Sequence, residues 1–216
     1  MRDKIYQVAK DLFMRHGLGQ LTLGMVTERA GISRPAIHYH VKTKARLAEE
    51  VLEDYARSTL GHSRTIWIDP NASLRQKFER PLAFFRERYL HYNPGGRGDL
   101  PWSLFSRFYQ ESELMTPVMV STLRSAAREL ETFYQVAVEM AIMRGELRAG
   151  TPAADLALQL VAMVHQVGWL TWCHARFEPV EQLYASTLKL WEAAYGPAPV
   201  ADAQATGTAR ARRKSP

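Results

Sequence analysis

Apolar residues along this chain of 216 residues recur at the spacing of three and four positions that amphipathic helices show. No stretch alternates with the period of two that is typical of a half-buried strand. Helical segments are separated by turn signals at Asp69-Pro70-Asn71, residues 93–98, Gly145 and Gly196-Pro197. The pattern predicts an all-α fold of about nine helices.

The segment from Thr22 to Lys44 has the pattern of two short helices joined by a tight turn. Thr22 and Ser33 are predicted N-caps, because their hydroxyls can accept hydrogen bonds from free backbone amides. Gly31 is predicted to end the first helix in the left-handed conformation, which costs glycine little. A small apolar core is available from Val26, Ala30, Ile32, Ile37 and Val41.

This arrangement leaves Arg34, Pro35, His38 and Tyr39 on the outer side of the second short helix. An exposed helix start with Arg, His and Tyr suits the major groove of DNA. We expect Arg34 to reach base edges or phosphate, and Lys44, at the start of the next helix, to reach phosphate only. The predicted DNA-binding residues are Thr22, Ser33, Arg34, Pro35, His38, Tyr39, His40 and Lys44.

The N-terminal segment resembles the DNA-binding domain of the TetR (tetracycline-repressor) family of bacterial transcription regulators in the order and spacing of its parts. The matching parts are Ile5 to Gly17, Thr22 to Ala30, the turn to Ser33, and Ile37 to Leu47. Val41 stands where the family pattern has Phe, and His38 where it has Tyr. The resemblance implies a helix-turn-helix domain at residues 1–46 and a ligand-binding and dimerisation domain at 47–197.

The charge distribution agrees with a DNA-binding head on a neutral body. Lys and Arg outnumber Asp and Glu by nine to five in residues 1–50 and by four to one in residues 201–216, whereas residues 51–200 have fifteen against sixteen. The formal charge of +6 therefore lies at the two ends. Residues 198–216 read as a disordered basic tail, whose role, if it has one, would be to contact phosphates through Arg210, Arg212, Arg213 and Lys214.

The body contains further helix signals. A fourth helix is expected from Thr43 toward Leu60, linking head to body, and a later one from Thr151-Pro152, read as a cap followed by a proline in the first turn. Pro81 interrupts an apolar pattern, and the sequence leaves open whether it kinks one helix or starts another. The last two long segments, 152–176 and 179–195, have broad apolar faces and are expected to form a homodimer.

Aromatic and methionine side chains are abundant in the body, which favours a pocket for a small, largely apolar effector; the same residues also fill ordinary cores. His165 would either orient such a ligand or be a satisfied core histidine. The Gly-rich run 95–98 is a candidate entry lid. The predicted pocket residues are Trp102, Phe105, Phe108, Tyr109, Met119, Phe133, Met140, His165, Trp169 and Trp172.

Other classes fit the sequence poorly. No P-loop, dinucleotide fingerprint or nucleophile elbow occurs, so we expect no enzyme and no cofactor. The neighbours Cys173 and His174 point apart on a helix and lack further ligands, so no metal site is expected. A single cysteine and an N-terminus without a signal peptide favour the cytoplasm, and polar residues in the most apolar stretch, 156–172, argue against a membrane span.

These patterns and the resemblance together predict a ligand-responsive, homodimeric regulator that binds a double-stranded DNA operator. It is expected to be a repressor that leaves the operator when a small-molecule effector binds. Two alternatives remain open. One is a helical adaptor that binds another protein and has no specific DNA affinity, and the other is a transcription activator of the same fold.

Overall fold

The computed structural model describes residues 1–197, within which the chain forms nine α-helices, one 3₁₀ helix and no strand. The predicted all-α fold is confirmed. The predicted tail, 198–216, lies outside the described residues.

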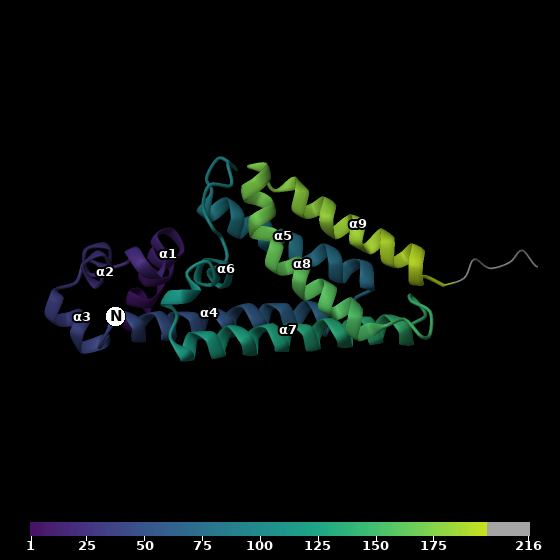
Figure 1. Cartoon of the computed structure of the whole chain (residues 1–216), viewed down its shortest axis with the longest axis horizontal. Coiled ribbons are helices and arrows are strands. Elements are labelled where there is room, and N and C mark those ends of the chain that lie inside the picture. Colours follow the sequence, from purple (N-terminus) through teal and green to yellow (C-terminus); the bar gives the residue numbers. More distant parts are fainter. Residues whose placement is uncertain (198–216) are drawn as a thin grey trace, which may run out of the picture.

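Helices α1 (Arg2–Gln20), α2 (Leu23–Ala30) and α3 (Arg34–His40) form a head at one end of the elongated molecule (Figure 1). Their apolar faces meet in a core in which Ile5, Phe13, Leu21 and Ile37 are almost fully buried. Helix α1 runs past its predicted end at Gly17, but it is broken there, because Gly17 has φ 71° and ψ −172°.

Helix α4 (Lys44–Trp67) leaves the head and runs through the body beside α7 (Pro117–Met143), as Figure 1 shows. Helices α5 (Leu74–Tyr92) and α8 (Ala153–His174) pack on this pair, and α9 (Glu178–Tyr195) packs on α5 and α8. Aromatic rings join these layers edge to face: the ring centroid of Trp67 lies 4.7 Å from that of Tyr134, and Phe78 lies 5.2 Å from Trp191. Helix α6 (Leu104–Tyr109) and the 3₁₀ helix η1 (Ser112–Leu114) lie where the body meets the head.

The structure decides the roles of two residues in the body, Pro81 and Thr151. Pro81 lies inside one helix, α5, and its ring is buried, so the open choice resolves to a proline accommodated within a helix. The cap predicted at Thr151 is wrong: α8 begins at Ala153 without a side-chain cap, because the Thr151 hydroxyl donates to the carbonyl oxygen of Arg148 at 2.7 Å.

The far end of α4 is attached to the core by a buried lysine. Lys77 of α5 is fully buried, and its Nζ donates to the carbonyl oxygen of Trp67 at 2.8 Å. Trp67 is the last residue of α4, so the lysine satisfies a carbonyl that no helical amide reaches. Desolvation by burial is the main cause that lowers the pKa of Lys77.

Among the described helices, only α8 is long and apolar enough to cross a membrane by length and composition alone. One third of its most apolar window is buried within this single chain. A core or interface helix passes the same test.

Candidate functional site

The turn between α2 and α3 is built from caps that the sequence specifies locally. The Thr22 and Ser33 hydroxyls accept from the amides of Met25 (3.2 Å) and Ala36 (3.4 Å). Gly31 ends α2 in the left-handed conformation (φ 64°, ψ 40°). These interactions fix the angle between the two short helices without a linker.

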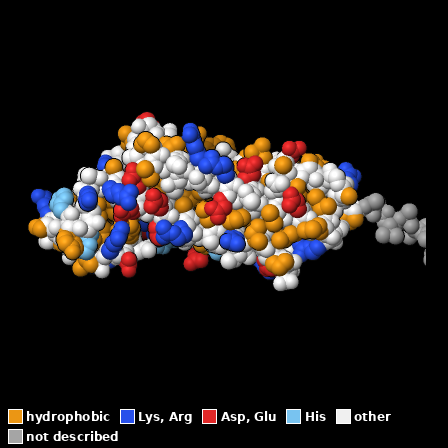
Figure 2. Space-filling model, turned by 90° about the horizontal axis from the view of Figure 1, so that it is seen from below, with side chains coloured by type: hydrophobic (Ala, Val, Ile, Leu, Met, Phe, Trp, Pro, Cys, Tyr) orange, Lys and Arg blue, Asp and Glu red, His pale blue; other side chains and the backbone are white. Residues whose placement is uncertain are grey.

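The outer side of α3 is exposed where DNA contacts are predicted. Arg34, Pro35, His38 and Tyr39 are exposed, and Tyr39 retains 87% of its accessible surface. His40 is half-buried, with its ring edge-to-face on Tyr39 at 5.1 Å between centroids. Basic and histidine side chains are visible at this end of the molecule in Figure 2. The helix therefore presents donors, acceptors and an aromatic ring to a groove-sized partner.

Lys44 has a role that the sequence did not indicate. Its Nζ donates to the carbonyl oxygens of Leu18 (2.8 Å) and Gly19 (3.4 Å), at the end of α1. The side chain is half-buried. Lys44 thus holds α1 against the start of α4, and the geometry gives it an intramolecular partner in place of a free position toward phosphate.

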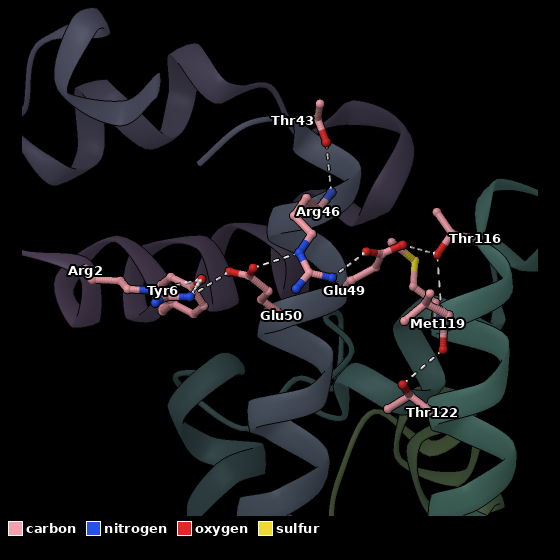
Figure 3. A network of polar contacts seen from close by, with 10 residues as sticks. Arg2, Tyr6, Thr43, Arg46, Glu49, Glu50, Thr116, Met119 and Thr122 are labelled. Carbon is pink, nitrogen blue, oxygen red and sulfur yellow. Dashed lines mark hydrogen bonds and ion pairs between the residues drawn. The ribbon is translucent and has the colours of Figure 1, made fainter. Parts of the chain in front are cut away.

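A chain of polar contacts connects α1, α4 and α7 (Figure 3). Arg2 of α1 and Arg46 of α4 both pair with Glu50, at 3.2 and 2.8 Å. Arg46 also pairs with Glu49, which accepts from the hydroxyl of Thr116 at 2.7 Å. Because Thr116 is the N-cap of α7, this network joins the head to a long helix of the body.

A second connection between head and body lies at the break in α1, and we call residues 17–20 the junction turn. The backbone amides of Leu18 and Gly19 donate to one carboxylate oxygen of Glu111, the latter at 3.0 Å. The other carboxylate oxygen of Glu111 pairs with Arg107 of α6 at 3.0 Å. A Cβ on Gly17 would lie within 2.2 Å of Glu111, so glycine allows this close approach. Sequence analysis missed the site, because it joins residues more than ninety positions apart.

A cavity of about 910 Å³ opens between α6, α7, α8 and residues 99–103. Its size falls within the range of about 300–1,000 Å³ that is typical of small-molecule sites. Six of the ten predicted pocket residues line it, namely Trp102, Phe105, Tyr109, His165, Trp169 and Trp172.

The other four predicted pocket residues lie elsewhere. Phe108 is buried against Phe13 of the head, with ring centroids 5.5 Å apart. The sulfur of Met140 lies 3.3 Å from Nζ of Lys77, and Met119 and Phe133 belong to the buried core. They share helical spacing with the lining residues, but Phe108 faces the head and the other three face the interior of the body, which spacing alone does not reveal.

The Gly-rich loop beside the cavity is anchored. Asn93 is buried and bonds both the amide (2.7 Å) and the carbonyl (3.0 Å) of Leu100, while the Tyr89 hydroxyl donates to Gly96 at 2.6 Å. A Cβ on Gly98 would lie 2.5 Å from the carbonyl oxygen of Thr171 in α8. These contacts argue against a freely moving lid.

Polar side chains form part of the cavity lining. The indole Nε1 of Trp102 donates to the hydroxyl of Thr171 at 2.9 Å, which fixes one aromatic wall. At the mouth, neighbouring side chains desolvate the imidazole of His165 and lower its pKa, although part of the ring reaches solvent. Within residues 1–197, no group of three His, Cys, Asp or Glu side chains is placed to hold a metal ion, and Cys173 is exposed.

The N-terminal domain is similar in sequence to known proteins. Residues 5–51 match the family described as bacterial regulatory proteins, tetR family. Two curated relatives are the HTH-type transcriptional repressor KstR2 of Mycolicibacterium smegmatis, 32% identical over 30% of this chain, and the HTH-type transcriptional regulator QacR of Staphylococcus aureus, 38% identical over 24%. These matches span 32% and 28% of the relatives' own lengths, about a third.

Solved structures extend the likeness to the body. A TetR-family transcriptional regulator from Agrobacterium tumefaciens superposes with a TM-score of 0.76, covering 88% of this chain and 96% of that one. Its sequence identity is 17%, so this likeness establishes the shared fold.

Proposed function

Because residues 5–51 place the N-terminal domain in the TetR family, and the described chain has the fold of that family's regulators, we propose that the protein is a homodimeric transcriptional repressor that leaves its operator when a largely apolar molecule binds in the body. The observation that carries the proposal is the exposed face of α3 on a helix-turn-helix that matches the family. One of the relatives is named a repressor, which favours repression over activation.

The DNA-binding step rests on the head. Arg34 and Pro35 stand in the first turn of α3, where their exposed side chains would face a phosphate or a base edge. His38 and Tyr39 extend this surface by one turn. The ring of Tyr39 meets the ring of His40 edge to face but remains 87% exposed in the single chain, which supports a role toward a partner such as DNA.

The dimer rests on the outer faces of α8 and α9. Leu158, Trp169, Trp172 and Leu190 expose 59–69% of their surface although they are large and apolar. Two helices from each copy, packed about a two-fold axis, would bury these side chains in a four-helix bundle. A dimer would also place two copies of α3 at a fixed separation, as an operator with two half-sites requires.

The effector step rests on the cavity and its connection to the head. Five aromatic side chains line the cavity, and Arg107 of α6 connects it through Glu111 to the junction turn. A ligand shifts the equilibrium between DNA-bound and free forms only by its differential affinity for the two.

A gel-shift assay with the DNA upstream of the protein's own gene tests the proposal. We expect wild-type protein to form a discrete complex that survives excess nonspecific DNA, and we expect Arg34→Ala to weaken it. Arg57→Ala is the matched control, because Arg57 is an exposed arginine of α4 that pairs with Asp54. Absence of any preference for this DNA over unrelated DNA, across a range of salt concentrations, would favour the adaptor alternative.

A further inference from the structure

We infer that the cavity binds an amphipathic anion, an apolar body that carries one carboxylate, and that this carboxylate takes Arg107 in competition with Glu111. The regulatory half of this inference rests on the proposed function, whereas the ligand class can be tested without DNA.

The charges around the cavity favour an anion. Arg107 and Arg124 line it, against a single acidic residue, Asp99. In the part of the chain that the structure describes, Arg124 forms no ion pair, so its guanidinium is available at the wall. Arg107 is already paired with Glu111, so an anion is favoured where it can meet the guanidinium of Arg124 or take that of Arg107 from Glu111.

Arg107 lacks one hydrogen-bond acceptor. Its side chain is only 18% exposed, and its Nε is buried without a partner among the described residues. One terminal nitrogen pairs with Glu111 at 3.0 Å, and the other donates to the side-chain oxygen of Gln110 at 3.5 Å. A buried donor without an acceptor is costly and rare in folded proteins, so turning this guanidinium toward an acceptor in the cavity that Arg107 lines would remove that cost. A carboxylate is the acceptor that matches a guanidinium best.

The rest of the cavity suits an apolar body. Phe105, Leu123 and Leu130 line its inner wall, and Trp169 and Trp172 stand at its exposed side. These surfaces carry no charge, so the charged end of a ligand is expected to lie toward Arg107 and Arg124. The ligand is therefore expected to have one charged end and an otherwise apolar structure.

Glu111 connects ligand binding at Arg107 to the head. One of its oxygens pairs with Arg107, and the other accepts the two amides of the junction turn. A ligand carboxylate on Arg107 weakens the pair that fixes Glu111 in place. The turn then loses its acceptor, and with it the connection between α6 and the end of α1. Because this contact differs between the two states, the ligand has a differential affinity that can move the head.

Ligand class is tested by calorimetry on the full chain without DNA, using decanoate, decanol and decyltrimethylammonium as probes with the same tail. We expect decanoate to bind wild-type protein at least about tenfold more tightly than either of the others, the ratio that one charge-assisted hydrogen bond supports. Arg107→Gln should remove that preference and leave decanol binding unchanged. Arg57→Gln is the matched control and should bind as wild type does.

Coupling is tested by measuring operator affinity with and without saturating decanoate. Wild-type affinity should fall by about fivefold or more, and by linkage DNA should weaken decanoate binding by the same factor. Glu111→Gln keeps an acceptor for the junction turn but loses the ion pair, so this variant should bind decanoate at least as tightly as wild type while its operator affinity no longer responds.

The outcomes are separable. Decanol or decyltrimethylammonium binding as tightly as decanoate, no decanoate binding up to concentrations of the order of 1 mM, or unchanged preference in Arg107→Gln would overturn the ligand class. A full response of operator affinity in Glu111→Gln would overturn the role of Glu111. Failure of wild-type protein to bind operator DNA would refute the proposed function and leave the calorimetric result standing.

Discussion

The carboxylate of Glu49 in α4 accepts a hydrogen bond from the hydroxyl of Thr116 at 2.7 Å, and the same hydroxyl oxygen accepts from the amide of Met119 at 3.3 Å. One side-chain oxygen thus caps α7 and ties it to the helix that enters the head. Figure 3 shows this contact within a series of polar contacts that runs from Arg2 through Glu50, Arg46 and Glu49 to Thr116 and Met119.

Replacing Thr116 by valine should therefore cost more than an ordinary cap. Loss of the N-cap alone lowers the free energy of unfolding by about 1 kcal/mol, and Glu49 also loses a partner. Thr116→Ser keeps the oxygen and should remain close to wild type. Urea unfolding of the two variants measures the difference; equal stability would show that the hydroxyl contributes nothing.

Gly17→Ala should destabilise the protein more than Gly31→Ala. Both glycines have positive φ. Gly31 (φ 64°, ψ 40°) lies in the left-handed region, where a side chain costs about 1–2 kcal/mol, whereas Gly17 (φ 71°, ψ −172°) lies in a region essentially restricted to glycine. A Cβ at Gly31 meets open space, whereas one at Gly17 displaces the side chains of Glu111 and Arg107. Thermal unfolding of both variants compares the costs. A Gly17→Ala protein no less stable than Gly31→Ala would mean that the contact with Glu111 is dispensable.

Arg34→Ala should weaken DNA binding alone, whereas Lys44→Ala should also lower the stability of the protein. Arg34 is exposed at the start of α3, so its loss should weaken operator binding by about 1–3 kcal/mol with little effect on stability. Lys44 bonds the carbonyl of Leu18, so its removal should lower the melting temperature as well. Gel shift at several salt concentrations, with thermal unfolding beside it, separates the two. A purely electrostatic role for Lys44 would instead lower the salt slope by about one and leave stability intact.

Charge substitutions should split the dimer at exposed positions and unfold the chain at buried ones. Leu160 and Leu188 are 1% and 4% exposed, so a charge there disrupts the core of the single chain. Leu158 and Leu190 are 59% and 69% exposed, so Leu158→Glu and Leu190→Glu should yield folded monomers. Sedimentation and circular dichroism report the two properties. Folded dimers of both exposed variants would place the interface elsewhere.

The free energy of unfolding should decrease between neutral pH and pH 5, and His62 should account for part of this decrease. Burial and, to a lesser extent, Arg88 lower the pKa of His62, so the unfolded chain takes up the proton first. Stability is therefore full above the unfolded value of about 6.5 and falls as the pH drops toward the lower folded value. His62→Phe keeps the ring that stacks on Phe84 and should flatten the profile; the exposed His91→Phe should not. Chemical unfolding at pH 7, 6 and 5 measures this, and parallel profiles for wild type and His62→Phe would exclude the residue.

Local signals were read correctly from the sequence, because their partners are close along the chain. Thr22, Ser33 and Thr43 cap the helices that they precede, each through an amide three residues on. Thr151 failed as a cap because its hydroxyl found a preceding carbonyl instead.

Contacts between distant segments were beyond the reach of periodicity. Helical spacing marked Phe108 and Met140 as apolar, but only tertiary packing decides that they face the head and the buried Lys77. Glu111 has no sequence signal, since it follows a short helix as an ordinary acidic residue.

The buried contact between Lys77 and Trp67 makes the far end of α4 a pivot. With 24 residues, this helix is about 36 Å long, at 1.5 Å per residue. A tilt of about 5° about the anchored end displaces the end that enters the head by about 3 Å, more than the helix shifts of about 1–2 Å that accompany many allosteric transitions. A tilt that is small at the core around Lys77 would thus become, at the opposite end, a displacement large enough to move α3 out of register with a DNA groove.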